Sequence, residues 1–270
     1  MAHDARKVLR HTFDEDAELY DRARPGYPEP LFDDVGALAG LGPDSTILEI
    51  GCGPGKATLP LARRGYSVLC IELGHRLAAV ARRNLAAFPR VEVVTAAFET
   101  WEPRRAPFDV VFAASSWHWI DPDIRYAKAA ALLKPGGALA IVGSGRADGE
   151  QSDPFFQQIR ECYRTMRAAA EAGSPSHSRP ASDPPAEIEQ SGLFAQLHVR
   201  RYSWATEYTA DEYVDFLNTH SGYRAMDPAT RAAFYAEVRR LIDTRPGRRV
   251  RRPHARTLYL ALTPAQHGAA

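Results

Sequence analysis

The stretch LEIGCGPGKAT, residues 48–58, decides the fold. It is an apolar run containing Glu49, followed by three closely spaced glycines, Gly51, Gly53 and Gly55, and then by residues of helical character. Glycine lets a chain turn sharply after a strand and lets a ligand approach the backbone closely. The stretch therefore predicts a strand, a ligand-binding turn and a helix.

Four further apolar runs follow, separated by segments of helical periodicity. Alternating strands and helices indicate right-handed crossovers and a parallel sheet, and runs that are apolar throughout indicate strands covered on both faces. The five runs are TILEIG (46–51), YSVLCIE (66–72), VEVVTAA (91–97), FDVVFAA (108–114) and ALAIVGS (138–144), with helices predicted over Lys56–Arg64, Gly74–Phe88 and Pro122–Leu133.

The two ends of the chain follow other patterns. A short helix, an extended arm at RARPGYP (22–28) and a helix ending near Gly40 are predicted before the core. After residue 145, two closing strands joined by a helical insertion indicate an antiparallel addition to the sheet edge. The predicted elements are a helix over Asp153–Ala172, a mobile loop over 173–185, a strand over 197–204, helices over Thr209–Asn218 and Pro228–Asp243, a basic turn over 245–256 and a strand over 257–263.

Composition excludes several classes of protein. With 34 basic and 33 acidic residues among 270, no overall charge draws the chain to nucleic acid or anionic lipid. The three cysteines, Cys52, Cys70 and Cys162, form no C-x-x-C pair, and the histidines form no H-x-x-x-H pair, so no metal site is expected. The charged first 20 residues and the lack of a long apolar window predict a cytoplasmic protein with no membrane partner.

The acidic residues near the glycines indicate what the turn binds. A dinucleotide fingerprint has a third glycine where this chain has Lys56, and Glu49 would repel a pyrophosphate. Glu72 ends the next strand, near the spacing at which a carboxylate accepts hydrogen bonds from ribose hydroxyls. A nucleoside with a cationic appendage satisfies both carboxylates. We therefore expect S-adenosylmethionine as cofactor and S-adenosylhomocysteine as product.

Longer motifs resemble a known family, the class I S-adenosylmethionine-dependent methyltransferases, and within it the type 11, trans-aconitate methyltransferase-like branch. The resemblance is good from Phe13 to Ser144 and looser over the end strands. It rests on an arm Y-x-x-x-R-P-x-Y-P (20–28), the cofactor loop LEIGCGPG (48–55, with Gly55 as its last residue), IEL (71–73), FDVVFAASSWHWID (108–121) and LLKPGGALAI (132–141).

The resemblance implies roles at the methionine end of the cofactor. Gly51 and Gly53 would lie under the methionine part, with Glu49 near its ammonium group. Tyr20 and Arg24 of the arm would close over the cofactor, with Arg24 near its carboxylate.

The resemblance also implies roles for residues at the nucleoside end of the cofactor and for one residue after the fourth strand. Glu72 would bind the ribose diol and Leu73 would flank the adenine. Ala97 and Phe98 would border the adenine edge, although many members of the family have Asp where this chain has Ala97. Ser115 would follow the fourth strand near the methionine end.

Two polar stretches are candidates for the acceptor side. In SSWHWID (115–121), His118 is a candidate general base or substrate donor, and Trp117 and Trp119 are candidate substrate contacts. The alternative is that His118 caps the turn while the tryptophans pack. NTHSGY (218–223) supplies His220 as a second catalytic candidate and Asn218, Ser221 and Tyr223 as substrate contacts, or else is only a helix end followed by a glycine turn.

Together, the pattern and the resemblance predict an α/β fold: a Rossmann-like seven-stranded, mostly parallel sheet whose last strand is antiparallel, with helices on both faces and a helical cap. The expected parts are an arm and helix (1–40), a cofactor-binding core (41–145), a helical and loop cap segment (146–190) and edge strands with a helical insertion (191–270). In-line methyl transfer needs mainly alignment, which supplies about 7–11 kcal/mol.

The expected acceptor is an oxygen or nitrogen of a small molecule, such as a carboxylate or a secondary metabolite. RNA or protein methylation, motivated by the Arg-rich segment RPGRRVRRPHAR (245–256), remains an alternative, as does a relative that binds the cofactor without methylating; a solvated loop is the simpler interpretation of the Arg-rich segment.

Overall fold

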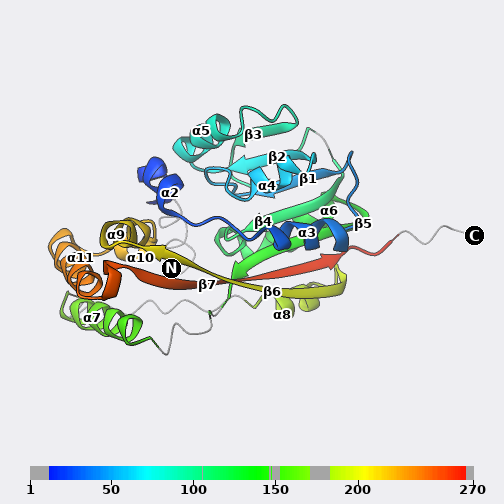
Figure 1. The fold of residues 1–270 in the computed structure, drawn as a ribbon. Coiled ribbons are helices and arrows are strands. Elements are labelled where there is room, and N and C mark those ends of the chain that lie inside the picture. Colours follow the sequence, from blue (N-terminus) through cyan, green and yellow to red (C-terminus); the bar gives the residue numbers. More distant parts are fainter. Residues whose placement is uncertain (1–11, 105, 146, 148–152, 171–182, 266–270) are drawn as a thin grey trace, which may run out of the picture.

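The computed structural model describes residues 12–104, 106–145, 147, 153–170 and 183–265. A seven-stranded sheet runs through it in the order β3-β2-β1-β4-β5-β7-β6 (Figure 1). The strands β1 to β5 are parallel, and β7 is antiparallel to both of its neighbours, which confirms the predicted fold class. The strands are β1 (Thr46–Ile50), β2 (Ser67–Glu72), β3 (Val91–Thr95), β4 (Phe108–Ala114), β5 (Leu133–Ser144), β6 (Ala195–Tyr208) and β7 (Val250–Leu262).

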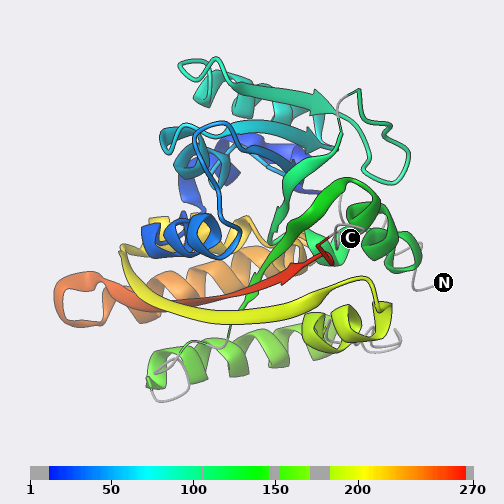
Figure 2. The ribbon, with the colours of Figure 1, turned by 90° about the vertical axis from the view of Figure 1, so that its right-hand side faces the viewer.

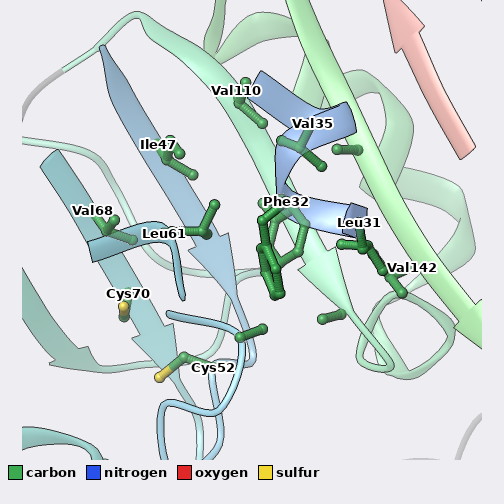
Figure 3. Close-up of a cluster of buried hydrophobic side chains, with 14 of the residues drawn as sticks. Leu31, Phe32, Val35, Ile47, Cys52, Leu61, Val68, Cys70, Val110 and Val142 are labelled. Atoms are coloured by element: carbon green, nitrogen blue, oxygen red, sulfur yellow. The ribbon is translucent and has the colours of Figure 1, made fainter. Parts of the chain in front are cut away.

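Helices cover both faces of this sheet. On one face, α3 (Glu29–Leu38), α4 (Thr58–Arg63) and α5 (His75–Asn84) enclose a cluster that includes the fully buried Phe32 (Figure 3) and Phe112. On the other face, α6 (Pro122–Ala131) and α8 (Pro184–Ser191) pack on a second cluster. Strands covered on both sides account for the continuous apolar runs of the sequence.

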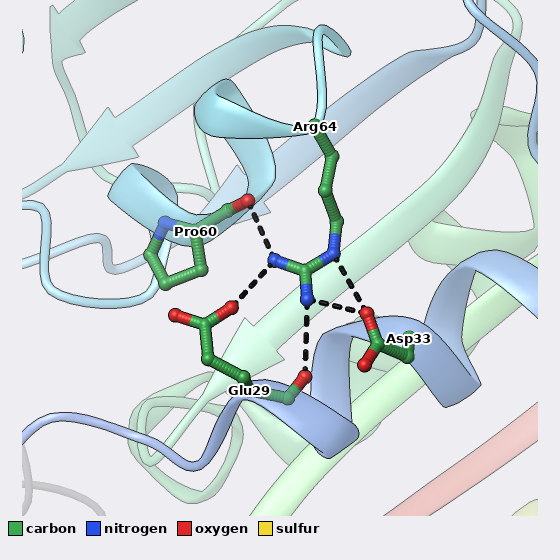
Figure 4. Close-up of polar contacts among 4 residues, drawn as sticks. All are labelled: Glu29, Asp33, Pro60 and Arg64. Carbon is green, nitrogen blue, oxygen red and sulfur yellow. Dashed lines mark hydrogen bonds and ion pairs between the residues drawn. The ribbon is translucent and has the colours of Figure 1, made fainter.

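The segment before the sheet runs along the outside of the core. After the short helix η1 (Thr12–Asp16) and α2 (Ala17–Ala23), the chain is extended until α3 begins. Arg64, just after α4, fixes α3 in place: its guanidinium donates to Glu29 Oε2 at 2.9 Å and, through Nε, to Asp33 Oδ1 at 3.2 Å (Figure 4). The start of α3 is thereby held against the core, at the base of the arm.

The last two strands extend beyond the rest of the sheet and carry a helical layer (Figures 1 and 2). Ser144, the last residue of β5, pairs with Arg256, but β7 already begins at Val250, paired with Tyr208 of β6. Four helices share a separate apolar cluster with this overhang: α7 (Pro154–Ala170), α9 (Ala210–Asn218), α10 (Ser221–Arg224) and α11 (Pro228–Asp243). We call these four helices the cap.

The structure corrects the prediction of a basic turn over residues 245–256. Only η3 (Pro246–Arg248) is a turn, and β7 begins at Val250 because β6 is long enough to pair with the whole Arg-rich segment. Arginines at and beside the turn are paired with acids: the exposed Arg248 lies 2.9 Å from Asp243, and the half-buried Arg245 lies 3.1 Å from Asp153. Of the predicted mobile loop over 173–185, residues 173–182 lie outside the described residues, and α8 begins at Pro184.

Candidate functional site

The turn after β1 brings backbone, and few side-chain atoms, to the wall of a cavity. Gly51 and Gly53 have φ values of +69° and +57°, in the left-handed region that favours glycine. A Cβ on Gly51 would lie 2.6 Å from the Cβ of Ser116, so any side chain there would displace the loop after β4. A Cβ on Gly53 would meet nothing closer than the Tyr20 ring, at 3.9 Å. The turn is therefore close-packed on one side and open toward the arm on the other.

Glu72, the last residue of β2, is fixed by backbone groups. Its Oε2 accepts from Gly53 N–H and its Oε1 from Gly74 N–H, both at 2.8 Å. Burial raises the pKa of Glu72, and these two N–H groups oppose that rise. The carboxylate thus connects the turn after β1 to the turn after β2, and each oxygen keeps a lone pair for a ligand hydroxyl.

Glu49 on β1 is the more deeply buried acid, with 1% of its surface exposed. Burial raises its pKa from an ordinary 4.5 to about 7; a hydrogen bond from Thr58 lowers the pKa, and the nearby Glu72 raises it. Its charge therefore depends on what else enters the cavity. A cation beside it would favour the ionised form.

The arm crosses the cavity and contacts the cap. Arg24 donates through Nη1 to His220 Nε2 at 3.1 Å and through Nη2 to the carbonyl of Thr219 at 3.4 Å, and its guanidinium lies 5.3 Å from the centre of the Tyr20 ring. Three residues farther along, Tyr27 donates to Ser115 Oγ at 3.1 Å. The arm is thus bonded to the cap by one residue and to the carboxyl end of β4 by another.

His220 has both ring nitrogens engaged. Because Nε2 accepts from Arg24, the hydrogen-bond network assigns the proton to Nδ1, which donates to the carbonyl of Phe216 at 3.0 Å. Burial and the Arg24 charge hold the pKa of His220 well below 6.5. These contacts favour a positioning role for His220, which holds Arg24 in place. They do not favour the catalytic proton transfer for which the sequence made His220 a candidate.

The WHW segment divides between packing and the cavity. Trp117 is 2% exposed and meets the ring of Tyr126 edge-on, with centroids 5.1 Å apart, so the packing alternative describes it. His118 and Trp119 line the cavity, their ring centroids 4.9 Å apart. The helix that follows is capped by Asp121, which accepts from Asp123 N–H, so capping it does not require His118.

These groups line one cavity of about 640 Å³, within the usual range for small-molecule sites, ~300–1,000 Å³. The structure brings most of the predicted site residues to its wall. They are Tyr20, Arg24, Glu49, Gly51, Gly53, Glu72, Leu73, Ala97, Phe98, Ser115, His118, Trp119, His220, Ser221 and Tyr223.

Three predicted residues lie off this wall. Gly55 packs under the turn, where an added Cβ would lie 2.9 Å from Leu85. Trp117 is in the core, as described above. Asn218 accepts a hydrogen bond from the hydroxyl of Tyr235 at 3.3 Å and faces away, within the cap.

The contribution of β7 to the cavity wall was not predicted from the sequence. Arg252, His254 and Arg256, which alternate along the overhang, line the cavity, although the segment was assigned to a solvated turn. Burial, with the charges of Arg252 and Arg256, lowers the pKa of His254 from 6.5 to about 3. The period-two spacing of these three residues was the available signal, since alternate residues of a strand share a face.

Within the described ranges, no group of three or more His, Cys, Asp or Glu side chains is placed to hold a metal ion. In the same part of the chain, no helix combines the length and the apolar character needed to cross a bilayer.

Comparison with known sequences gives a consistent family of relatives. Residues 47–137 match the family model described as a methyltransferase domain. An uncharacterized methyltransferase of Mycobacterium tuberculosis (strain ATCC 25618 / H37Rv) is 26% identical over 243 residues, 90% of either chain. A trans-aconitate 2-methyltransferase of Methylobacterium radiotolerans is 27% identical over 208 residues, which are 73% of this chain and 76% of the relative.

Solved structures agree. A candidate type II methyltransferase from Anaeromyxobacter dehalogenans superposes with a TM-score of 0.57 at 26% identity, covering 89% of this chain and 96% of the other. A phosphoethanolamine N-methyltransferase from Haemonchus contortus, in complex with S-adenosylhomocysteine, superposes with a TM-score of 0.54 at 17% identity, covering 93% and 57%. The second likeness concerns the fold alone.

Proposed function

The chain is a class I S-adenosylmethionine-dependent methyltransferase, and from that premise we propose that it methylates an oxygen or nitrogen atom of a small molecule. The observation that carries the proposal is the cavity, which joins the cofactor turn to a second region walled by the arm, the cap and β7. An acceptor enclosed in this way must be small, because both ligands share about 640 Å³.

The residues on the cofactor side suit S-adenosylmethionine. Glu72 has lone pairs left for the ribose hydroxyls, and Glu49 is a buried carboxylate whose ionised form a cationic ammonium would favour. The glycine turn lets the ligand approach the backbone. Leu73 and Phe98 supply apolar surface for the adenine, and Ala97 leaves its amino group without a carboxylate partner from that position.

When bound, S-adenosylmethionine supplies the methyl group: the acceptor's lone pair forms the new bond to carbon while the carbon–sulfur bond breaks, and that electron pair stays on sulfur in S-adenosylhomocysteine. The chain's own residues align the acceptor and exclude water. His118 is the candidate to accept a proton from an acceptor that must lose one, since it lines the cavity beside the carboxyl end of β4. His220 instead holds Arg24 in place.

Methylation of RNA or protein finds less support. It was motivated by the Arg-rich segment, but Arg252 and Arg256 line the cavity and Arg245 and Arg248 form ion pairs with acids. A protein that binds the cofactor without transferring a methyl group differs in one measurable respect: it releases no S-adenosylhomocysteine with any acceptor.

Two measurements test the proposal. Calorimetry should show binding of S-adenosylmethionine that Glu72→Gln weakens about tenfold or more, as expected for loss of a charge-assisted bond. The matched control, Glu92→Gln, changes an exposed acid on the neighbouring strand β3 and should leave the affinity unchanged.

The second measurement is release of S-adenosylhomocysteine with a panel of acids, phenols and amines. Turnover with a member of the panel supports the proposal, and His118→Ala should then lower turnover far more than cofactor affinity. Cofactor affinity that is indifferent to Glu72→Gln, or cofactor binding without turnover across the panel, would contradict it.

A further inference from the structure

We propose that the acceptor carries an anionic group and that Arg256 is the residue that binds it. The inference rests on the proposed function, because it assigns the substrate class of the same cavity. It comes from the placement, the partners and the electrostatic surroundings of Arg256.

Arg256 lies in the acceptor region because of the strand register. Ser115, at the end of β4, donates its backbone N–H to Val142 of β5, and two residues farther along β5, Ser144 pairs with Arg256. Since a strand advances about 3.3 Å per residue, Arg256 stands roughly 7 Å outward from the level at which β4 ends. It is therefore on the overhang that faces the cofactor turn across the cavity, and it lines that cavity.

The Arg256 guanidinium has neutral partners. It lies 5.8 Å from the ring centres of Tyr27 and Trp204, and its Nη1 donates to the carbonyl of Ala255 at 2.9 Å. Its Nε–H is buried without a hydrogen-bond partner, and no carboxylate in the described part of the chain forms an ion pair with it. A guanidinium stays charged in proteins, so a partly buried positive charge without a carboxylate partner remains beside the cavity.

The neighbouring groups add positive charge. Arg24 also forms no ion pair within the described ranges, since its donors go to a neutral histidine and a carbonyl. Burial lowers the pKa of Arg256 and the charge of Arg24 lowers it further, and Arg252 and Arg256 both depress the pKa of His254. The region is thus short of negative charge, which a bound anion would supply.

The cofactor alone does not supply enough negative charge. In the site that the family resemblance implies, its single carboxylate would lie against Arg24 on the arm. The carboxylates that line this cavity, Glu49, Glu72 and Glu99, lie on β1, at the end of β2 and after β3, at the cofactor side. Arg256 is on the strand opposite. A carboxylate or a phosphate of the acceptor matches the planar fork of a guanidinium.

The group that Arg256 binds serves as an anchor. Oxygens that accept charge-assisted hydrogen bonds lose nucleophilicity, because the same lone pairs and charge are engaged by the guanidinium. Methyl transfer therefore takes place at another atom of the acceptor. In the methylated product, the anchoring anionic group is accordingly still unmethylated.

The test measures anion binding to the protein loaded with S-adenosylhomocysteine. Calorimetry with benzoate, phenyl phosphate and the neutral benzamide should show a preference for an anion, and comparison of the two anions separates a carboxylate site from a phosphate site. Arg256→Gln should weaken the preferred anion about 10- to 100-fold, and Arg256→Lys should restore part of the loss. Both variants should keep their affinity for S-adenosylhomocysteine, which also shows that they fold.

The matched control is Arg251→Gln, an exposed arginine next to Arg252 on β7 that does not line the cavity. It should leave anion binding unchanged. Equal affinity for benzoate, phenyl phosphate and benzamide, or equal losses in the Arg251 and Arg256 variants, would overturn the inference. Anion binding through Arg256 without any methyl transfer would contradict the proposed function instead, and turnover of neutral acceptors alone would contradict only this inference.

Discussion

At the scale of single residues, Glu49 makes cofactor binding depend on pH. Its pKa of about 7 lies above the ordinary 4.5, so the empty protein loses the corresponding stability as pH rises from about 4.5 through 7, where the unfolded chain releases a proton that the folded chain retains. A ligand ammonium has the opposite preference, because it interacts with the ionised carboxylate.

We therefore predict that affinity for S-adenosylmethionine rises about five- to tenfold from pH 6 to pH 7.5, following the ionised fraction of a group with a pKa near 7. Calorimetry across this range measures it. Glu49→Gln should bind more weakly and show a flat profile. A slope that persists in the variant would mean that another group titrates.

The sequence predicted which residues form the cofactor loop, but it did not predict which of them face the cavity. Gly51 and Gly53 line the cavity, but Gly55 packs toward Leu85. A glycine pattern indicates where the backbone needs conformational freedom, and it does not indicate which glycines contact a ligand. The sequence likewise left open whether Trp117 contacts the substrate or packs in the core. Its neighbour His118 faces the cavity and Trp117 faces the core, a division made by the local 3₁₀ turn.

At the scale of elements, the first helix of the described chain, η1, is attached to α5 because one of its side chains accepts N–H groups at the start of that helix. Asp14 Oδ1 accepts the backbone N–H groups of Arg76 and Leu77, at 2.8 and 2.9 Å, at the start of α5. The residue before that helix, Gly74, has no side chain to do this, and a Cβ there would lie 2.5 Å from Asp14 Oδ1. The contact fixes the arm, and with it Tyr20, over the cofactor turn.

Asp14→Ala should loosen the arm and leave the core folded. Loss of the hydrogen bonds that Asp14 accepts at the N-terminus of α5 costs about 0.5–2 kcal/mol of stability, so we expect cofactor affinity to fall roughly 2- to 30-fold. Trypsin cleavage after Arg22 should accelerate by a similar factor. Gly74→Ala should have the same effects from the other side of the contact, while Asp44→Ala, at an exposed loop residue, should have none. Unchanged cleavage would show that α2 is held by its other contacts alone.

The strand β7 shows why the acceptor side was harder to predict than the cofactor side. Strands β1 to β5 are recognisable in the sequence as apolar runs, because both of their faces are covered. The overhang of β7 carries arginine, proline and histidine, which are atypical of strands, and its pairing depends on the length of β6, more than 40 residues earlier in the chain. Long-range pairing of this kind leaves only the alternation of Arg252, His254 and Arg256 as a local sign.

At the scale of the whole molecule, one ligand contacts segments that are far apart in the sequence. The arm, the loops after β1 and β2, the cap and the overhang of β7 all contribute to the cavity wall. The chain's own contacts also join them. Arg22 and Asp215 lie 3.2 Å apart, but both side chains are exposed and such pairs contribute little, whereas the part-buried Arg24 donates to His220 at 3.1 Å. A ligand that contacts all of these segments is expected to add a further link between core and cap.

This arrangement predicts how hydrogen exchange responds to S-adenosylhomocysteine. A ligand at 100 times its dissociation constant stabilises the folded state by about 2.7 kcal/mol, and amides should slow in residues 17–28, 209–224 and 250–256 as well as in 49–55. Mass spectrometry of peptides from these segments measures the change, with Glu72→Gln at the same ligand concentration as the control in which it should be much smaller. Protection confined to 49–98 would mean that core and cap respond independently, since a ligand can slow exchange in the arm and β7 only if its binding depends on their being closed.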